Sequence, residues 1–182
     1  MKLKNTLILG NALKIDGWMN EKELVWLAAN AMMYDKIVEV GCWMGRSTRA
    51  LADNTDGTVW AVDHWLGSSE HQILLQDKTP DYLFEMFCKN LAEHIHSGRV
   101  RPVRLPSVQA ALYLEPIKFD MVFIDGSHDY ESVVEDIKAW KPMVRSGGII
   151  CGHDRGYPPV TNAILDTLGN PGGETDIWVV QL

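Results

Sequence analysis

The sequence predicts an α/β fold: a doubly wound, mainly parallel sheet of six to seven strands with helices on both faces. Short runs of apolar, β-branched residues alternate along the chain with longer stretches that carry apolar residues at helical spacing. This alternation is typical of βαβ units, whose strands lie parallel and are buried on both faces. Acidic residues also follow several of the runs directly, where ligands bind in this fold class.

The elements can be assigned in chain order from these patterns. Strands are expected at residues 36–40, 58–62, 100–105, 119–124, 149–152 and 176–180. Helices are expected at residues 20–34, 47–53, 81–96, 108–114, 130–143 and 160–168. Asn20 with Glu23 three residues later predicts a capping box at the start of the first helix. Arginines alternate with apolar residues in the third strand, which favours a place at the sheet edge. The earlier stretch TLILG is left open as a strand or a packed arm.

Length, composition and charge limit the classes of function. The chain has 182 residues with 46% hydrophobic and 23% charged content, which suits one domain over residues 1–182. The formal net charge of −7 argues against a nucleic-acid partner. Three cysteines without a C-x-x-C pair, and no apolar run of about 18 residues, favour a cytoplasmic protein without a membrane partner. Residues 1–19 are interpreted as an N-terminal arm and residues 66–80 as a candidate lid. A homodimer is left open.

A glycine turn follows the first strand. Gly41 and Gly45 bracket this turn, and Ser47 opens the next helix, whose first N–H groups can point at a ligand. Glu39 lies two residues before Gly41, where an acid would repel the pyrophosphate of a dinucleotide. The pattern also lacks the G-x-G-x-x-G spacing. A ligand with a cationic or hydrogen-bond-donating group fits better.

The segment EVGCWMGRST resembles motif I of the class I S-adenosylmethionine (SAM) dependent methyltransferases. The later segment IDGSHDYESVVEDIKAWKPMVRSGGIICGHD is similar to a small branch of that class, the cephalosporin-hydroxylase-like and macrocin-type O-methyltransferases of methyltransferase family 24. The resemblance runs from about residue 17 to residue 154. It implies a Rossmann-like fold with SAM as the cofactor.

Several residues are expected to bind that cofactor. Asp63 ends the second strand, about 20 residues past the glycine turn, where an acid meets ribose hydroxyls in doubly wound sheets; the resemblance gives it the same role. His64 and Trp65 follow and are assigned to the adenine face. The resemblance implies that Ser107, just after the third strand, contacts the adenine. The complete expected cofactor set is Glu39, Gly41, Gly45, Ser47, Asp63, His64, Trp65, Ser107 and Asp125.

Asp125, His128, His153 and Asp154 follow the fourth and fifth strands, so they should share one edge of the sheet. The resemblance implies a divalent metal held by Asp125, His153 and Asp154. Relatives use Mg²⁺ with an acid at the position of His153, so the histidine here favours Mn²⁺, Fe²⁺ or Zn²⁺, or no metal. His128, His153 and Asp125 are the candidate catalytic residues, with a histidine taking the acceptor proton. In the alternative, His128 caps a helix and His153 is structural.

The leading hypothesis is a SAM-dependent methyltransferase acting on a small polar acceptor, on the oxygen of a hydroxyl group such as that of a sugar or natural product. Metal assistance is part of this hypothesis. One alternative is a catalytically silent SAM-binding or scaffold domain, because the chain is short. A second is an NAD-linked oxidoreductase, which the missing dinucleotide fingerprint disfavours.

Overall fold

A computed structural model describes residues 6–68 and 71–182 and contains, within them, one sheet of six strands. The strand order is β3-β2-β1-β4-β5-β6. The pairs from β3 to β5 are parallel, and β6 pairs antiparallel with β5. The strands are β1 (Lys36–Val40), β2 (Thr58–Asp63), β3 (Val100–Arg104), β4 (Phe119–Ile124), β5 (Val144–Gly152) and β6 (Trp178–Gln181). The predicted fold class is confirmed, and β3 lies at the sheet edge as its arginines indicated.

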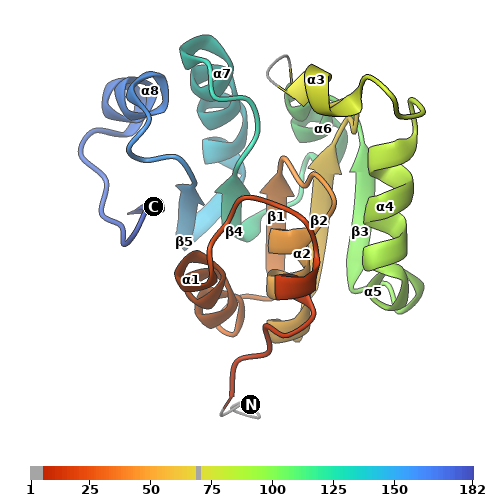
Figure 1. Ribbon diagram of the computed structural model, residues 1–182. Helices are drawn as coiled ribbons and strands as arrows, with labels where there is room; N and C mark the ends of the chain where they lie inside the picture. The colour runs from red at the N-terminus through yellow and green to blue at the C-terminus, as the bar shows by residue number, and fades with distance from the viewer. Residues whose placement is uncertain (1–5, 69–70) are drawn as a thin grey trace.

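Helices cover both faces of the sheet (Figure 1). One face carries α1 (Glu21–Ala31), α2 (Arg46–Asn54), α4 (Tyr82–Asn90) and α5 (Ala92–His96). The other carries α6 (Ser107–Leu114), α7 (Tyr130–Trp140) and α8 (Pro158–Leu168). The short elements are η1 (Ala12–Lys14), α3 (Gln72–Leu75) and η3 (Lys141–Met143). No helix among the described residues is both long and apolar enough to cross a lipid bilayer.

Successive strand residues pack on opposite sides of the sheet, because side chains alternate along a strand. In β1, Ile37 joins the core under α1 and α2, while Val38 joins the core under α6 and α7. Both side chains are fully buried. Burial on both faces explains why these strands are continuous apolar runs rather than alternating ones.

The N-terminal arm packs against α2. The guanidinium of Arg46 donates to the carbonyl oxygens of Met19 at 2.9 Å and Ile15 at 2.7 Å. Asn54 exchanges hydrogen bonds with the backbone of Ile8. From residue 6 onward, TLILG is thus a packed arm rather than a strand; residues 1–5 of the predicted arm lie outside the described residues. The arm then enters α1, where Asn20 and Glu23 form the predicted capping box.

The long helix expected at residues 81–96 is divided into α4 and α5. Leu91 lies between them with φ −108° and ψ 11°, outside the helical range, and its side chain is fully buried in the core. The apolar stripe continues across this break, so periodicity alone could not reveal it.

The sheet has a switch point between β1 and β4, which are neighbours although β2 and β3 lie between them in sequence. The chain leaves β1 toward one edge and returns at β4 toward the other. In open α/β sheets, a crevice for ligands forms at the carboxyl ends of the strands at such a point.

Candidate active site

A cavity of about 1000 Å³ lies at this carboxyl edge. The arm, the glycine turn, the ends of β2, β4 and β5, the start of α6 and part of residues 67–74 line it. The predicted site residues among its lining are Gly41, Ser47, Asp63, His64, Ser107, Asp125, His128, His153 and Asp154. The volume is at the upper end of the range for small-molecule sites, enough for a nucleoside cofactor and a second small ligand.

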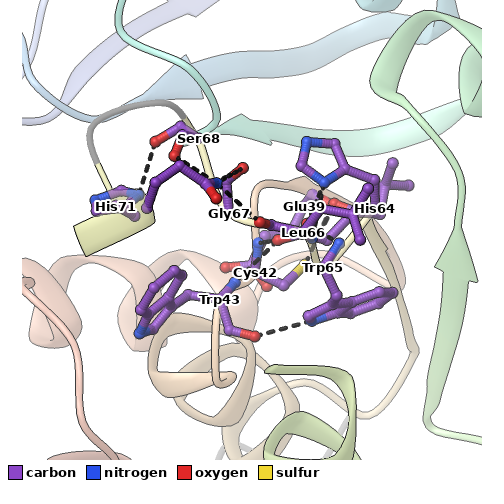
Figure 2. A network of polar contacts seen from close by, with 12 residues as sticks. Glu39, Cys42, Trp43, His64, Trp65, Leu66, Gly67, Ser68 and His71 are labelled. Carbon is purple, nitrogen blue, oxygen red and sulfur yellow. Dashed lines mark hydrogen bonds and ion pairs between the residues drawn. The ribbon is translucent and has the colours of Figure 1, made fainter. Parts of the chain in front are cut away.

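Asp63 ties the glycine turn to the end of β2. Its Oδ2 accepts hydrogen bonds from the backbone N–H groups of Cys42 at 2.8 Å and Trp43 at 3.0 Å. Its Oδ1 accepts from the N–H of Trp65 at 2.6 Å. Figure 2 shows Cys42, Trp43 and Trp65 meeting at this junction. Asp63 therefore shapes the cavity floor, and its side chain remains 15% exposed beside the cavity.

The two glycines of the turn are required for different reasons. Gly41 has φ +86°, and a Cβ there would lie 2.0 Å from the carbonyl oxygen of Asp125. Gly45 has φ +90°, and a Cβ there would meet the Leu91 side chain at 2.3 Å. Gly45 does not line the cavity, so its expected ligand contact is replaced by contact with the core.

Glu39 is fully buried beneath the turn. Its Oε2 accepts a hydrogen bond from Thr48 Oγ1 at 2.5 Å, while its Oε1 has no hydrogen-bond partner. Burial raises the pKa of Glu39 to about 8, although hydroxyl groups in the first turn of α2 lower it. An unpartnered buried carboxyl oxygen fits a cofactor that brings a donor or a positive charge. Glu39 is not among the residues that line the cavity, so its contact with the cofactor stays a prediction.

The expectation that Trp65 contacts adenine is wrong. Its ring is 1% exposed and packs on Phe84 and Phe87 of α4, with ring centroids 4.9 and 4.8 Å away. Its Nε1 donates to the carbonyl oxygen of Trp43 at 2.8 Å, as Figure 2 shows. Trp65 is therefore a core residue outside the cavity lining, and Trp43 lines the cavity instead.

The remaining cofactor candidates keep their places on the cavity wall. Ser107 opens α6, and its hydroxyl accepts a hydrogen bond from Trp140 Nε1 at 2.9 Å. His64 is 43% exposed at the side chain, and its Nδ1 accepts from the N–H of Leu66 at 3.0 Å. The adenine contacts expected of Ser107 and His64 stay predictions.

The expected acid and histidine cluster does form. His128 Nε2 lies 3.0 Å from Asp154 Oδ2, and His153 Nδ1 lies 3.3 Å from the same oxygen. His153 Nδ1 also lies 3.8 Å from Asp125. Asp129, not His128, caps α7, since its side chain accepts from the N–H of Ser132. The helix-capping alternative for His128 is therefore wrong.

Glu23 is the member of this cluster that the sequence did not reveal. Its Oε2 lies 3.3 Å from His153 Nε2, and the Glu23 side chain is 6% exposed. It was recognised only as part of the capping box, where it also acts. Its contact with His153, just after β5, depends on how α1 packs against the sheet, and the spacing of residues in the sequence does not show this.

His153 is the positively charged group among the carboxylates of Asp125, Asp154 and Glu23. Burial alone would lower the pKa of His153, but hydrogen bonding to Asp154 and the charges of Asp125 and Glu23 raise it to about 9. Burial raises the pKa of Asp125 to about 6, an effect that the positive charge of His153 reduces. Burial would also raise the pKa of Asp154, but hydrogen bonds from His128 and His153 hold it well below its usual range.

A second possible metal set lies beside the predicted one, whose members are close together, with His153 Nδ1 3.8 Å from Asp125 and 3.3 Å from Asp154. Among the described residues, the ligand atoms of Asp125, His128 and Asp154 lie within 4.8 Å of one another, as do those of His153, Asp154 and Asp176. The structure thus joins the two acids to His128, while His153 faces carboxylates on both sides.

Residues 38–155 match a family model described as a methyltransferase domain. The chain belongs to this methyltransferase family. The match includes the glycine turn, Asp63 and four members of the cluster, Asp125, His128, His153 and Asp154. The chain is a SAM-dependent methyltransferase.

Several solved structures share its fold. The O-methyltransferase from Bacillus cereus in complex with SAH is 17% identical, with a TM-score of 0.66 over 94% of this chain and 87% of that one. The SAH-bound Podospora anserina methyltransferase PaMTH1 is 14% identical, with a TM-score of 0.67 over 89% of this chain and 78% of that one. Cofactor-bound Rv0187 from MTB is 20% identical, with a TM-score of 0.66 over 94% and 84%.

Proposed function

We propose that this methyltransferase moves the methyl group of SAM to a hydroxyl oxygen of a small acceptor. One observation carries the proposal: a single cavity joins the glycine turn and Asp63 to the cluster of Asp125, His128 and Asp154. Methyl transfer is an in-line displacement, so cofactor and acceptor must be held close together, with a base near the acceptor. A shared cavity meets both needs. The net charge of −7 also favours a small acceptor over a nucleic acid.

His128 is our candidate for the group that takes the acceptor proton. A carboxylate bonded to one ring nitrogen orients an imidazole and makes its other nitrogen a better base. Asp154 is within 3.0 Å of His128 Nε2 and is placed to do this. His153 is a poorer candidate than the sequence indicated, because its two nitrogens face Asp154 and Glu23. We therefore propose His153 as a positive charge that holds the surrounding carboxylates together.

A divalent metal is the second candidate at the same place. Two carboxylates and an imidazole, from Asp125, His128 and Asp154, are close enough to hold one. This mixed oxygen and nitrogen set suits Mn²⁺, Fe²⁺ or Zn²⁺ better than Mg²⁺. A bound cation would lower the pKa of an acceptor hydroxyl. Since it would occupy His128, the roles of base and metal ligand for this residue exclude each other.

His128→Asn tests the site. We expect methyl transfer from SAM to a panel of hydroxyl acceptors to fall by about 100-fold or more in kcat. Affinity for S-adenosylhomocysteine (SAH), measured by calorimetry, should stay unchanged. His96→Asn is the matched control, because His96 is exposed at the end of α5, away from the cavity, and this variant should keep full activity. A fully active His128→Asn enzyme would contradict the assignment.

Chelation separates the two roles of His128. If His128 acts as a base without metal, exhaustive chelation should leave turnover of the wild-type protein unchanged. Loss of turnover that returns on adding Mn²⁺, Fe²⁺ or Zn²⁺ would instead assign the cluster to a metal. SAH binding without turnover on any acceptor would favour the silent SAM-binding domain.

Three unpaired cysteines support our further proposal that the protein works in the cytoplasm.

A further inference from the structure

One wall of the cavity consists of aromatic and aliphatic side chains that the methyl transfer step does not use. This aromatic wall consists of Trp18, Trp43, His71, Ile73 and Leu74, all of which line the cavity. Its members come from three separate segments: the N-terminal arm, the glycine turn and residues 71–74. Because three segments distant in sequence contribute to it, this surface forms only through tertiary packing.

The wall is exposed although it is strongly apolar. Trp18 is 60% exposed, Ile73 72% and Leu74 55%. Burying a large apolar side chain away from water is normally favourable. A group of them left open to a cavity marks a surface that a ligand covers.

The rings of the wall are packed against one another. Trp18 stacks on His71 with ring centroids 4.7 Å apart and planes at 26°. Trp43 is tilted against Trp18 at 5.0 Å and against His71 at 4.9 Å. Figure 2 shows the rings of Trp43 and His71 on the same side of the loop network. These are contact distances, so no cation can sit between the rings as it does in an aromatic cage. What the wall offers is an outer surface for stacking.

Two polar groups beside the wall, His71 and Arg46, are already engaged. His71 Nδ1 is hydrogen-bonded to Ser68 Oγ at 2.7 Å. The guanidinium of Arg46 is occupied by the carbonyl oxygens of Ile15 and Met19. A sugar ring needs several donors and acceptors for its hydroxyl groups. A planar apolar ring needs a flat apolar surface, which this wall provides.

We propose that the aromatic wall is the acceptor subsite and that the acceptor carries a planar aromatic ring. This rests on the proposed function, because the ring would be held on the wall while its hydroxyl group reaches the cluster of Asp125, His128 and Asp154. It narrows the acceptor from any small polar molecule to an aromatic one, and it gives the arm and residues 71–74 a role in acceptor binding.

Two matched probes test the ring. Catechol and the vicinal cyclohexanediol carry the same pair of hydroxyl groups, on a flat and on a puckered ring. Calorimetry with SAH-loaded protein should find catechol bound at least about tenfold more tightly, since the flat ring can stack on the wall and the puckered ring cannot. Equal affinities, or no binding of catechol, would overturn the proposal.

Variants locate the binding on the wall. Trp18→Ala should weaken catechol binding about tenfold, and Ile73→Ser should weaken it by a smaller factor because it removes less contact area. The affinity for SAH should stay unchanged in both variants. Met33→Ala is the control: Met33 is 65% exposed but does not line the cavity, so both affinities should stay at the wild-type value. Unchanged catechol binding in both wall variants would refute the subsite. Failure of the wild-type protein to bind SAH would refute the proposed function instead.

Discussion

At the scale of single residues, Gly41 is the most constrained point of the site. Its N–H donates to the carbonyl oxygen of Val62 at 2.9 Å, which extends the pairing of β1 with β2. On the other side, Asp125 N–H donates to Val40 at 2.7 Å, so the end of β4 closes over the glycine. Gly41 is thus held between two backbones, and neither can move without disturbing the sheet.

Gly41→Ala should therefore destabilise the fold and not merely block the cofactor. Its Cβ would lie 2.0 Å from the Asp125 carbonyl oxygen, at a φ of +86° that an L residue rarely adopts. Backbone strain of this kind costs about 1–3 kcal/mol, and the overlap with backbone adds to it, so we expect a loss of at least about 3 kcal/mol. Urea unfolding measures it. Gly10→Ala is the control, because nothing lies within 4 Å of a Cβ there. Equal stability of the two variants would show that the turn can relax.

The sequence predicted that Gly41 is indispensable, but for a different reason. From the motif, close passage of the ligand was the expected constraint. The structure adds a neighbouring backbone, which spacing alone could not show. Trp65 illustrates the same limit. Its position beside Asp63 indicated a ligand contact, yet its ring turns into the core against α4. The sequence can predict that a residue lies at the end of a strand, but it does not show in which direction the side chain points.

At the scale of elements, a charged junction joins α2 to α5. Asp53 accepts hydrogen bonds from Arg49 Nε at 2.9 Å and pairs with His94 Nε2 at 2.7 Å. The Asp53 side chain is only 7% exposed. His94 therefore takes part in a buried junction, although it lies near the end of a short helix. Arg49 also pairs with Glu93, so the acids of this junction already have a cationic partner.

Asp53→Asn should destabilise the protein by about 2 kcal/mol, within the range for hydrogen bonds to a charged group. Burial raises the pKa of Asp53, but hydrogen bonds from His94 and Arg49 outweigh this and lower it. A carboxyl whose folded pKa lies below its unfolded value contributes stability above the unfolded pKa, and the contribution is lost as the pH falls through the folded one.

The measurement is urea unfolding of wild type and variant at neutral pH and again in acid. The difference between them should be largest at neutral pH and shrink as the pH is lowered. Glu93→Gln serves as the control, because Glu93 is 66% exposed and an exposed pair contributes about 1 kcal/mol or less. A constant difference at all pH values would show that Asp53 acts through packing and not through its charge.

Within elements, local rules predicted much of the structure correctly. Asn20 and Glu23 form the capping box expected from their spacing. The strands begin and end within a few residues of the expected limits, apart from β5, which begins at Val144. What local rules missed are contacts between elements. The pairing of Glu23 with His153 and the stack of Trp18 on His71 join segments far apart in sequence, and each depends on how helices and loops settle on the sheet.

At the scale of the whole molecule, the cavity proposed to bind the cofactor is lined by residues from most of the chain. The arm, the glycine turn and the ends of three strands meet at the switch point of the sheet (Figure 1). Such a site exists only in the folded state, because the unfolded chain brings none of these segments together. Binding of the correct cofactor must therefore stabilise the fold as a whole, by an amount set by its affinity.

This linkage separates a SAM site from a dinucleotide site. SAH at 100 times its Kd should raise the free energy of unfolding by about 2.7 kcal/mol, whereas NAD at the same concentration should leave it unchanged. In Asp63→Ala, the loss of charged hydrogen bonds to the ribose should weaken the binding free energy of SAH by roughly 2–3 kcal/mol. At the same SAH concentration its stabilisation should then drop below about 1 kcal/mol.

Each variant is compared with itself, with and without ligand, so the stability that Asp63→Ala removes from the ligand-free protein cancels in the difference, and what is left is the change in SAH affinity. Glu85→Ala, an exposed acid on α4, should keep the full SAH effect. If NAD stabilised the protein as strongly as SAH, the site would be a general nucleotide pocket. If Asp63→Ala kept the full effect, Asp63 would serve only the three N–H groups of Cys42, Trp43 and Trp65, and the ribose would have to be bound elsewhere on the cavity wall.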